Sequence, residues 1–174
     1  MMKPNWNVYY LTQCFLVAQR SLDPNTKCGA IIVSADNRVL SQGYNSPLKN
    51  SKDDEIPLTR PEKYCHMIHA EENAILAYNG SYQDIQGGTI YVTGSPCHKC
   101  LRMIIQKGIT NIIYPKFPIT VCQDQADLDA ANLMLAHHTY VKVTEVDCLG
   151  DIFRLLDQTA LYMDNKTNPD LNGK

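Results

Sequence analysis

Two short segments constrain this chain more than any other part of it: His69-Ala70-Glu71 and Pro96-Cys97-His98-Lys99-Cys100. Apart from His98, which lies between the two cysteines, they offer one imidazole, two thiols and one carboxylate, although a long stretch of sequence separates the two segments. An imidazole and two thiolates are ligands that Zn²⁺ takes in an open four-coordinate site, with the fourth position left to water. The fold must therefore bring both segments to one point.

The spacing within each segment predicts how it can reach that point. Cys97 and Cys100 are three positions apart, which puts them on one face of a helix. Pro96 suits the first position of that helix, where exposed amides and the helix dipole favour thiolate. His69 and Glu71 are two positions apart and would point to opposite sides of a regular helix. We therefore expect their helix to begin at about His69 or the next residue, so that two helix N-termini face each other across the metal.

Glu71 is the candidate proton carrier. Two thiolates neutralise the formal charge of Zn²⁺ and weaken it as a Lewis acid, so a nearby base that accepts a proton from water makes chemical sense. The plainer interpretation is that Glu71 only offsets the helix dipole, which is the role we expect for Glu72.

Other uses of these residue types compete with the open zinc site. A redox pair formed by the two cysteines would leave His69 and Glu71 without a role. A closed structural zinc site would take His66 as its fourth ligand and would also leave the carboxylate unused. Cys65 and His66 are candidates for a second, accessory metal. His98, between the two thiols, is expected to point away from the metal.

The composition favours a single soluble domain. The chain has 174 residues, of which 44% are hydrophobic and 20% charged, and this is ordinary for a globular protein. A net charge of −2 argues against a broad basic surface for nucleic acid. No apolar run has the length of a membrane span, and the N-terminus lacks a signal-peptide core. Without such a span, we expect no membrane partner. Seven cysteines, an odd count without a secretory signal, indicate a reducing, cytoplasmic location.

Hydrophobic periodicity and turn residues predict an alternation of helices and strands. The helices are expected over 7–20, 70–78, 96–107, 124–137 and 151–161, and the strands over 28–33, 39–44, 89–93, 109–114 and 140–146. This order predicts an α/β fold with three layers, α/β/α, around a five-stranded mixed sheet. Residues 45–64 form a long polar insertion of the kind that is often functional. One domain is expected over 1–163, followed by a loose polar tail over 164–174.

The two metal-binding segments together match the signature of zinc-dependent nucleobase deaminases. From about Val8 to Val146 the chain resembles the cytidine deaminase superfamily, and within it the deoxycytidylate (dCMP) deaminases. The similar stretches are 18–30, 43–45, 69–75, 91–100 and 104–109. The expected three-layer sheet is therefore a cytidine deaminase-like fold.

The resemblance implies hydrolytic deamination of dCMP to dUMP with release of ammonia, supplying thymidylate synthesis. It also implies a homo-oligomer, a hexamer in many members, that dCTP activates and dTTP inhibits, with Mg²⁺ bound to the nucleotide effector. The implied site residues are His69, Cys97 and Cys100 for zinc, Glu71 as proton shuttle, Asn45 on the sugar and the Ala70 backbone on the pyrimidine. Ser46 stands where the family commonly has glycine, which leaves effector control open.

A monophosphate substrate needs cationic partners. Lys27, after the first loop, and Lys116, after the fourth strand, lie near the expected mouth of the site and are the first candidates. Tyr114 is a candidate for stacking on the base or binding the phosphate. The other candidate cations, most of them expected to be ordinary surface charges, are Lys49, Arg60, Lys63 and Arg102.

Two further functions compete with nucleotide deamination. A deaminase of DNA or RNA would need a groove of basic and aromatic side chains. The net charge of −2, three phenylalanines and one tryptophan provide no obvious groove, although ten tyrosines keep one open. The third function is a non-catalytic, zinc-stabilised module that binds nucleotides.

Overall fold

The computed structural model describes residues 3–116 and 125–167. Its strands are β1 (Gly29–Val33), β2 (Val39–Tyr44), β3 (Ser46–Pro47), β4 (Met67–Ile68), β5 (Thr89–Val92), β6 (Asn111–Pro115) and β7 (Lys142–Val146). Its helices are α1 (Trp6–Ala18), the 3-10 helix η1 (Glu62–Cys65), α2 (Ala70–Ala77), α3 (Tyr82–Ile85), α4 (His98–Gln106), α5 (Gln125–His137) and α6 (Leu149–Thr167).

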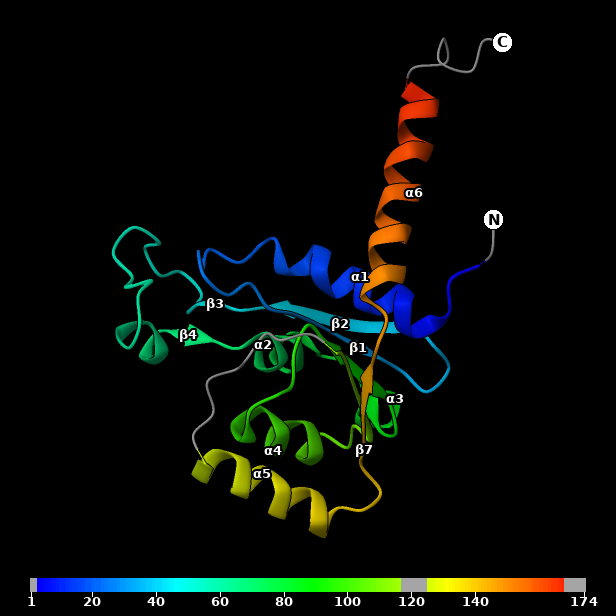
Figure 1. The fold of residues 1–174 in the computed structure, drawn as a ribbon. Helices are drawn as coiled ribbons and strands as arrows, with labels where there is room; N and C mark the ends of the chain where they lie inside the picture. The colour runs from blue at the N-terminus through cyan, green and yellow to red at the C-terminus, as the bar shows by residue number, and fades with distance from the viewer. Residues whose placement is uncertain (1–2, 117–124, 168–174) are drawn as a thin grey trace.

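The main sheet has five strands in the order β2-β1-β5-β6-β7 (Figure 1). β1 pairs antiparallel with both β2 and β5, whereas β5 with β6 and β6 with β7 are parallel. The predicted five-stranded mixed sheet is therefore confirmed. Among the described helices, none has the length and apolar character needed to cross a bilayer.

Helices cover both faces of the sheet, because β1 is buried along its whole length and needs apolar partners on each side. Ala30 and Ile32 face a cluster formed with α2, α4 and α5, whereas Ile31 and Val33 face a cluster formed with α1 and α6. Successive side chains of a strand point to opposite faces, which produces this division. Figure 1 shows the same two helical layers. The predicted three-layer α/β/α architecture is confirmed.

The second, two-stranded sheet lies within and just after the predicted insertion. β3 and β4 pair antiparallel, with Ser46 opposite Ile68 and Pro47 opposite Met67. Continued by one position, this register sets Asn45 opposite His69. The small sheet thus brings the end of β2 beside the start of α2.

Gly43 allows α2 to lie close against β2. A Cβ atom on this glycine would stand 2.3 Å from the Ala74 nitrogen and 2.4 Å from the Ala70 oxygen, too close for any side chain. The contact holds the first turn of α2 against the sheet, and with it the residues at the start of the helix.

Several element boundaries differ from the predictions. The first helix ends at Ala18, with Gln19 as its C-cap, rather than near Arg20. The last helix begins at Leu149 and continues to Thr167, into the stretch predicted as a tail. Residues 168–174 of that tail, the predicted loop after Lys116 and the predicted helix start at Asp124 lie outside the described residues.

Candidate metal centre and active site

His69 is the N-cap of α2, as the spacing of His69 and Glu71 predicts. Its backbone is extended, with φ −71° and ψ 157°, and its side chain makes no capping hydrogen bond. The imidazole is therefore turned out of the helix, while Glu71 lies in the first turn. The histidine and the carboxylate can then share one site although they are two positions apart.

Cys97 is the N-cap of α4, and Cys100 lies in its first turn. The helix begins at His98, so the prediction that Pro96 occupies its first position is wrong. Cys97 has extended backbone, with φ −71° and ψ 166°, and this geometry separates the proline from the helix. The conformation of the ligand residue, rather than the preference of proline for a first helical position, determines where the helix starts.

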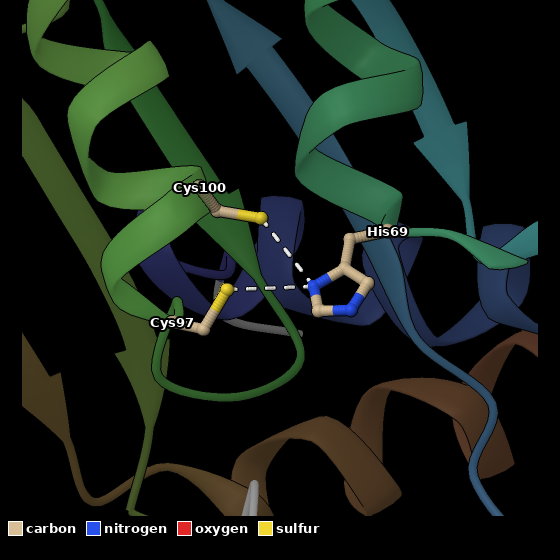
Figure 2. A group of neighbouring side chains, drawn as sticks. All are labelled: His69, Cys97 and Cys100. Atoms are coloured by element: carbon tan, nitrogen blue, oxygen red, sulfur yellow. Dashed lines mark hydrogen bonds between the residues drawn. The ribbon is translucent and has the colours of Figure 1, made fainter. Parts of the chain in front are cut away.

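The three predicted ligand side chains converge (Figure 2). His69 Nδ1 lies 3.6 Å from Cys97 Sγ and 3.4 Å from Cys100 Sγ, and the three ligand atoms lie within 4.8 Å of one another. In a tetrahedral zinc site, ligand nitrogen and sulfur atoms stand about 3.6 Å apart. The donor set and its spacing therefore fit Zn²⁺, and the described residues contain no second group of this kind.

The helix N-termini and neighbouring donors favour thiolate at this point. A hydrogen bond from the Cys100 thiol lowers the pKa of Cys97, and the His69 imidazole lowers it further. The first turns of α2 and α4 also direct their positive dipole ends toward the cluster, as Figure 2 shows. A thiolate is the form of cysteine that binds metal.

Glu71 lies beside the ligands without joining them. Its side chain is only 6% exposed, and burial raises the pKa of the carboxyl to about 6. Glu71 is not part of the group of possible ligands. A buried carboxyl that titrates near neutrality can both accept and release a proton.

The ligands and Glu71 open onto a cavity of about 380 Å³, within the usual range for small-molecule sites. Asn45 and Ala70 line this cavity, as expected. Lys27, Tyr114 and Lys116 are not among its described lining residues. Tyr114 packs against the core, and both lysines are exposed. Their contacts with a substrate stay predictions that the cavity does not support.

The family described as the cytidine and deoxycytidylate deaminase zinc-binding region matches residues 4–116. The chain belongs to this family. It is 39% identical over 115 residues to the deoxycytidylate deaminase of Homo sapiens, which covers 63% of this chain and 64% of the relative. It is 37% identical over 147 residues to the mouse (Mus musculus) enzyme, covering 80% of each. The match to the human relative thus spans less than two thirds of that protein's length.

A solved structure has the same fold. The dCMP deaminase from the cyanophage S-TIM5, in complex with dCMP and dUMP, superposes with a TM-score of 0.60 at 27% identity, and the match covers 84% of this chain and 100% of that one. Together with the His69, Cys97 and Cys100 cluster, membership of a zinc-binding deaminase family supports Zn²⁺ as the metal.

The alternatives to an open zinc site are weakened by the same geometry. His66 is exposed and belongs neither to the metal group nor to the cavity lining, so it does not close the site as a fourth ligand. Cys65 is likewise exposed and outside the group. A redox pair does not account for the approach of His69 to both thiols.

Asn45 organises one wall of the cavity. Its Oδ1 accepts a 2.7 Å hydrogen bond from the Cys28 amide, and its Nδ2 donates a 2.8 Å bond to the Thr26 carbonyl. The asparagine therefore fixes the loop before β1 as well as facing the cavity. Ser46, where the family commonly has glycine, accepts a 3.1 Å hydrogen bond from Asn73 Nδ2, which links β3 to α2.

Two pairs of cavity residues were missed by the sequence analysis. Lys63 forms an ion pair with Asp23, and both side chains are almost fully buried. His98 Nδ1 lies 2.9 Å from Asp127 Oδ1, and both residues line the cavity. His98 lies outside the group of possible metal ligands, which agrees with the expectation that it points away from the metal. No sequence signal joins partners that lie this far apart in the chain.

Proposed function

We propose that this chain catalyses the zinc-dependent hydrolytic deamination of deoxycytidine monophosphate to dUMP, with release of ammonia that leaves dUMP for thymidylate synthesis. The observation that carries the proposal is the convergence of His69, Cys97 and Cys100, with the buried Glu71 beside them but outside the ligand group. The choice of dCMP is supported by the names of the relatives and by the cyanophage enzyme solved with dCMP and dUMP.

Zn²⁺ held by His69, Cys97 and Cys100 would supply Lewis-acid activation of a water molecule. Glu71 accepts a proton from the water that attacks C4 of the cytosine ring. Glu71 delivers that proton to ring nitrogen N3, while the remaining hydroxyl forms a bond to C4. Glu71 then takes the proton of this C4 hydroxyl and gives it to the amino group, so that the C4–N4 bond breaks, the C4 carbonyl forms and ammonia leaves. The burial of Glu71 keeps these transfers away from bulk water.

Other residues of the cavity would hold the substrate. The Ala70 backbone would contact the pyrimidine, and Asn45 would contact the sugar. Asn45 Nδ2 carries two N–H groups, one of which is used on Thr26. The second can donate to a hydroxyl oxygen, so that one side chain both fixes the loop and binds the ligand.

The remaining parts of the proposal rest on the resemblance to deoxycytidylate deaminases. They comprise a cytoplasmic homo-oligomer, a hexamer by resemblance, with dCTP and dTTP as effectors and Mg²⁺ bound to the effector nucleotide. Nucleic acid is not the proposed partner, because a net charge of −2 is poorly suited to a polyanionic backbone.

The test is ammonia release by the zinc-loaded full chain from dCMP, dCTP, CMP, cytidine and cytosine, each with and without dCTP or dTTP as effector. We expect dCMP to be the preferred substrate. Glu71→Gln should retain zinc and lose about 10²- to 10⁴-fold in kcat, because general acid–base catalysis contributes that much. An active Glu71→Gln variant would contradict the mechanism. A zinc-loaded wild type that deaminates only single-stranded DNA or RNA would overturn the proposed substrate.

A further inference from the structure

The described residues that line the cavity include three cationic side chains: Arg60, Lys63 and Lys99. Any one of them could in principle meet a negatively charged part of a ligand. Lys63 is paired with a carboxylate, whereas Arg60 and Lys99 are exposed and make no ion pair with a carboxylate among the described residues. Of these two, only the arginine has a planar group that can donate two parallel hydrogen bonds.

Lys63 is already neutralised. Its ammonium donates a hydrogen bond to Asp23 Oδ2, and the two side chains are 4% and 3% exposed. Asp23 Oδ1 accepts hydrogen bonds from the amides of Asn25 and Thr26, at 2.9 and 3.0 Å. Lys63 therefore anchors the loop before β1 to η1. A ligand that bound the Lys63 ammonium would have to break this ion pair and leave Asp23 as an unpaired buried charge.

Arg60 has a different environment. Its side chain is exposed and lines the cavity, and in the described part of the chain it makes no ion pair with a carboxylate. Its Nη2 lies 3.5 Å from Thr26 Oγ1, and its guanidinium carbon lies 5.8 Å from the centre of the Tyr64 ring. Neither contact neutralises the charge of the guanidinium.

Cys28, Asp23 and Thr26 line the cavity together with Arg60 and Glu71. Burial raises the pKa of the Cys28 thiol to about 11, and the charges of Glu71 and Asp23 raise it further. Cys28 is therefore within electrostatic range of both the proton carrier and the Asp23–Lys63 pair. Thr26, next to Asp23 in the hydrogen-bonded loop, carries the hydroxyl that approaches Arg60. Among the lining residues, Arg60 is thus an exposed one beside the loop before β1, whereas Glu71 is a buried one beside the metal ligands.

We propose that Arg60 binds the 5′-phosphate of the substrate and so selects nucleoside monophosphates over nucleosides. The inference rests on the proposed function, since it sets the pyrimidine at Glu71 and the phosphate at the far end of the same cavity. The planar guanidinium can donate two parallel hydrogen bonds to a phosphate. The sequence analysis ranked Lys27 and Lys116 first for this phosphate contact. Neither lysine lines the cavity, whereas Arg60 does.

The test measures binding of dUMP, deoxyuridine and inorganic phosphate to the zinc-loaded full chain by titration calorimetry. Arg60→Gln should weaken dUMP binding about 10- to 100-fold, because a hydrogen-bonded charge of this kind contributes on that scale. The affinity for deoxyuridine should stay the same, and inorganic phosphate should compete with dUMP less effectively. Arg60→Lys should recover only part of the loss, since lysine lacks the two-pronged geometry.

Arg102→Gln is the matched control, because Arg102 is an exposed arginine of α4 that does not line the cavity. It should leave all three affinities unchanged. Equal losses for dUMP and deoxyuridine in Arg60→Gln would overturn the inference. So would a dUMP-specific loss in Lys99→Gln or Lys27→Gln with none in Arg60→Gln. Failure of the proposed function would appear separately, as a wild type that binds dUMP but does not deaminate dCMP.

Discussion

Glu71 and Asp23 are both buried carboxylic acids that line one cavity, and their surroundings shift their pKa values in opposite directions. Burial raises the pKa of Glu71 to about 6. Burial also acts to raise the pKa of Asp23, but hydrogen bonds from Lys63 and from the Asn25 and Thr26 amides outweigh it and lower the pKa overall. Surroundings that shift the pKa values of two carboxyls in opposite directions give the two groups different roles. Glu71 can carry a proton, whereas Asp23 keeps a fixed charge.

The lowered pKa of Asp23 predicts a pH-dependent contribution to folding. A carboxyl with a lower pKa in the folded chain stabilises it above the unfolded pKa of about 3.9, and the contribution disappears as pH falls through that value toward the folded one. We expect the urea midpoint of the wild type to fall more steeply below about pH 4 than that of Asp23→Asn combined with Lys63→Met. Equal slopes in the two proteins would contradict this role.

Residue identities at the metal centre could be predicted from sequence because His69, Glu71 and the two cysteines lie in short segments with fixed spacing. Asp23 and Lys63 could not be paired in the same way, since they are 40 positions apart. The two cations ranked first for the phosphate, Lys27 and Lys116, do not line the cavity for a related reason. Lys27 and Lys116 were chosen by their place next to expected strands, whereas the lining of a cavity depends on where each side chain points.

At the scale of elements, the site depends on where two helices begin. The start of α2 was predictable because His69 and Glu71 can converge in no other way. The start of α4 was not, because Pro96 suits a first helical position while Cys97 must stay extended to reach His69. The strands β1 and β2 were predictable from two hydrophobic runs separated by turn residues. The pairing of β3 with β4 was not, since each has two residues, too few for a pattern.

Gly43 gives an element-level prediction. Gly43→Ala should destabilise the chain by about 2 kcal/mol or more, because the new Cβ would collide with the backbone of α2. Moving α2 also moves His69, so zinc content after purification should fall. The control is Gly150→Ala in α6, where a Cβ meets nothing within 4 Å and alanine suits a helix better than glycine. Chemical denaturation and metal analysis measure both effects, and a Gly43→Ala chain as stable as the control would refute the close-packing argument.

At the scale of the whole molecule, the sheet order brings the two metal segments together. β1 lies between β2, which leads through β3 toward α2, and β5, which leads to α4. The segment after β5 supplies the two cysteines, and β4 leads into His69. The α/β/α architecture and the number of strands were predictable from the order of elements, because few topologies satisfy such an alternation. The ends of the last helix were not, since its polar end resembles a tail.

The sheet places the segment with His69 near the segment with Cys97 and Cys100. A bound metal would link these two segments directly. Removal of zinc with a chelator should lower the melting temperature, and added zinc should restore it, because the metal binds the folded chain in preference to the unfolded one. Cys97→Ser and Cys100→Ser should each reduce zinc content below one ion per chain. Cys65→Ser, at an exposed cysteine outside the cluster, should keep the full content. Loss of zinc in Cys65→Ser would show a second metal site instead.

His69 and Cys97 are N-caps, so the proposed reaction uses only the first turn of α2 and of α4. The metal ligands and the proton carrier Glu71 all lie at the start of these helices. Further along, residues such as Leu76 in α2 and Arg102 in α4 face solvent. Those outer faces can change by substitution without disturbing the chemistry. A lineage of such chains could therefore acquire new contact surfaces on these two helices while the reaction stays the same.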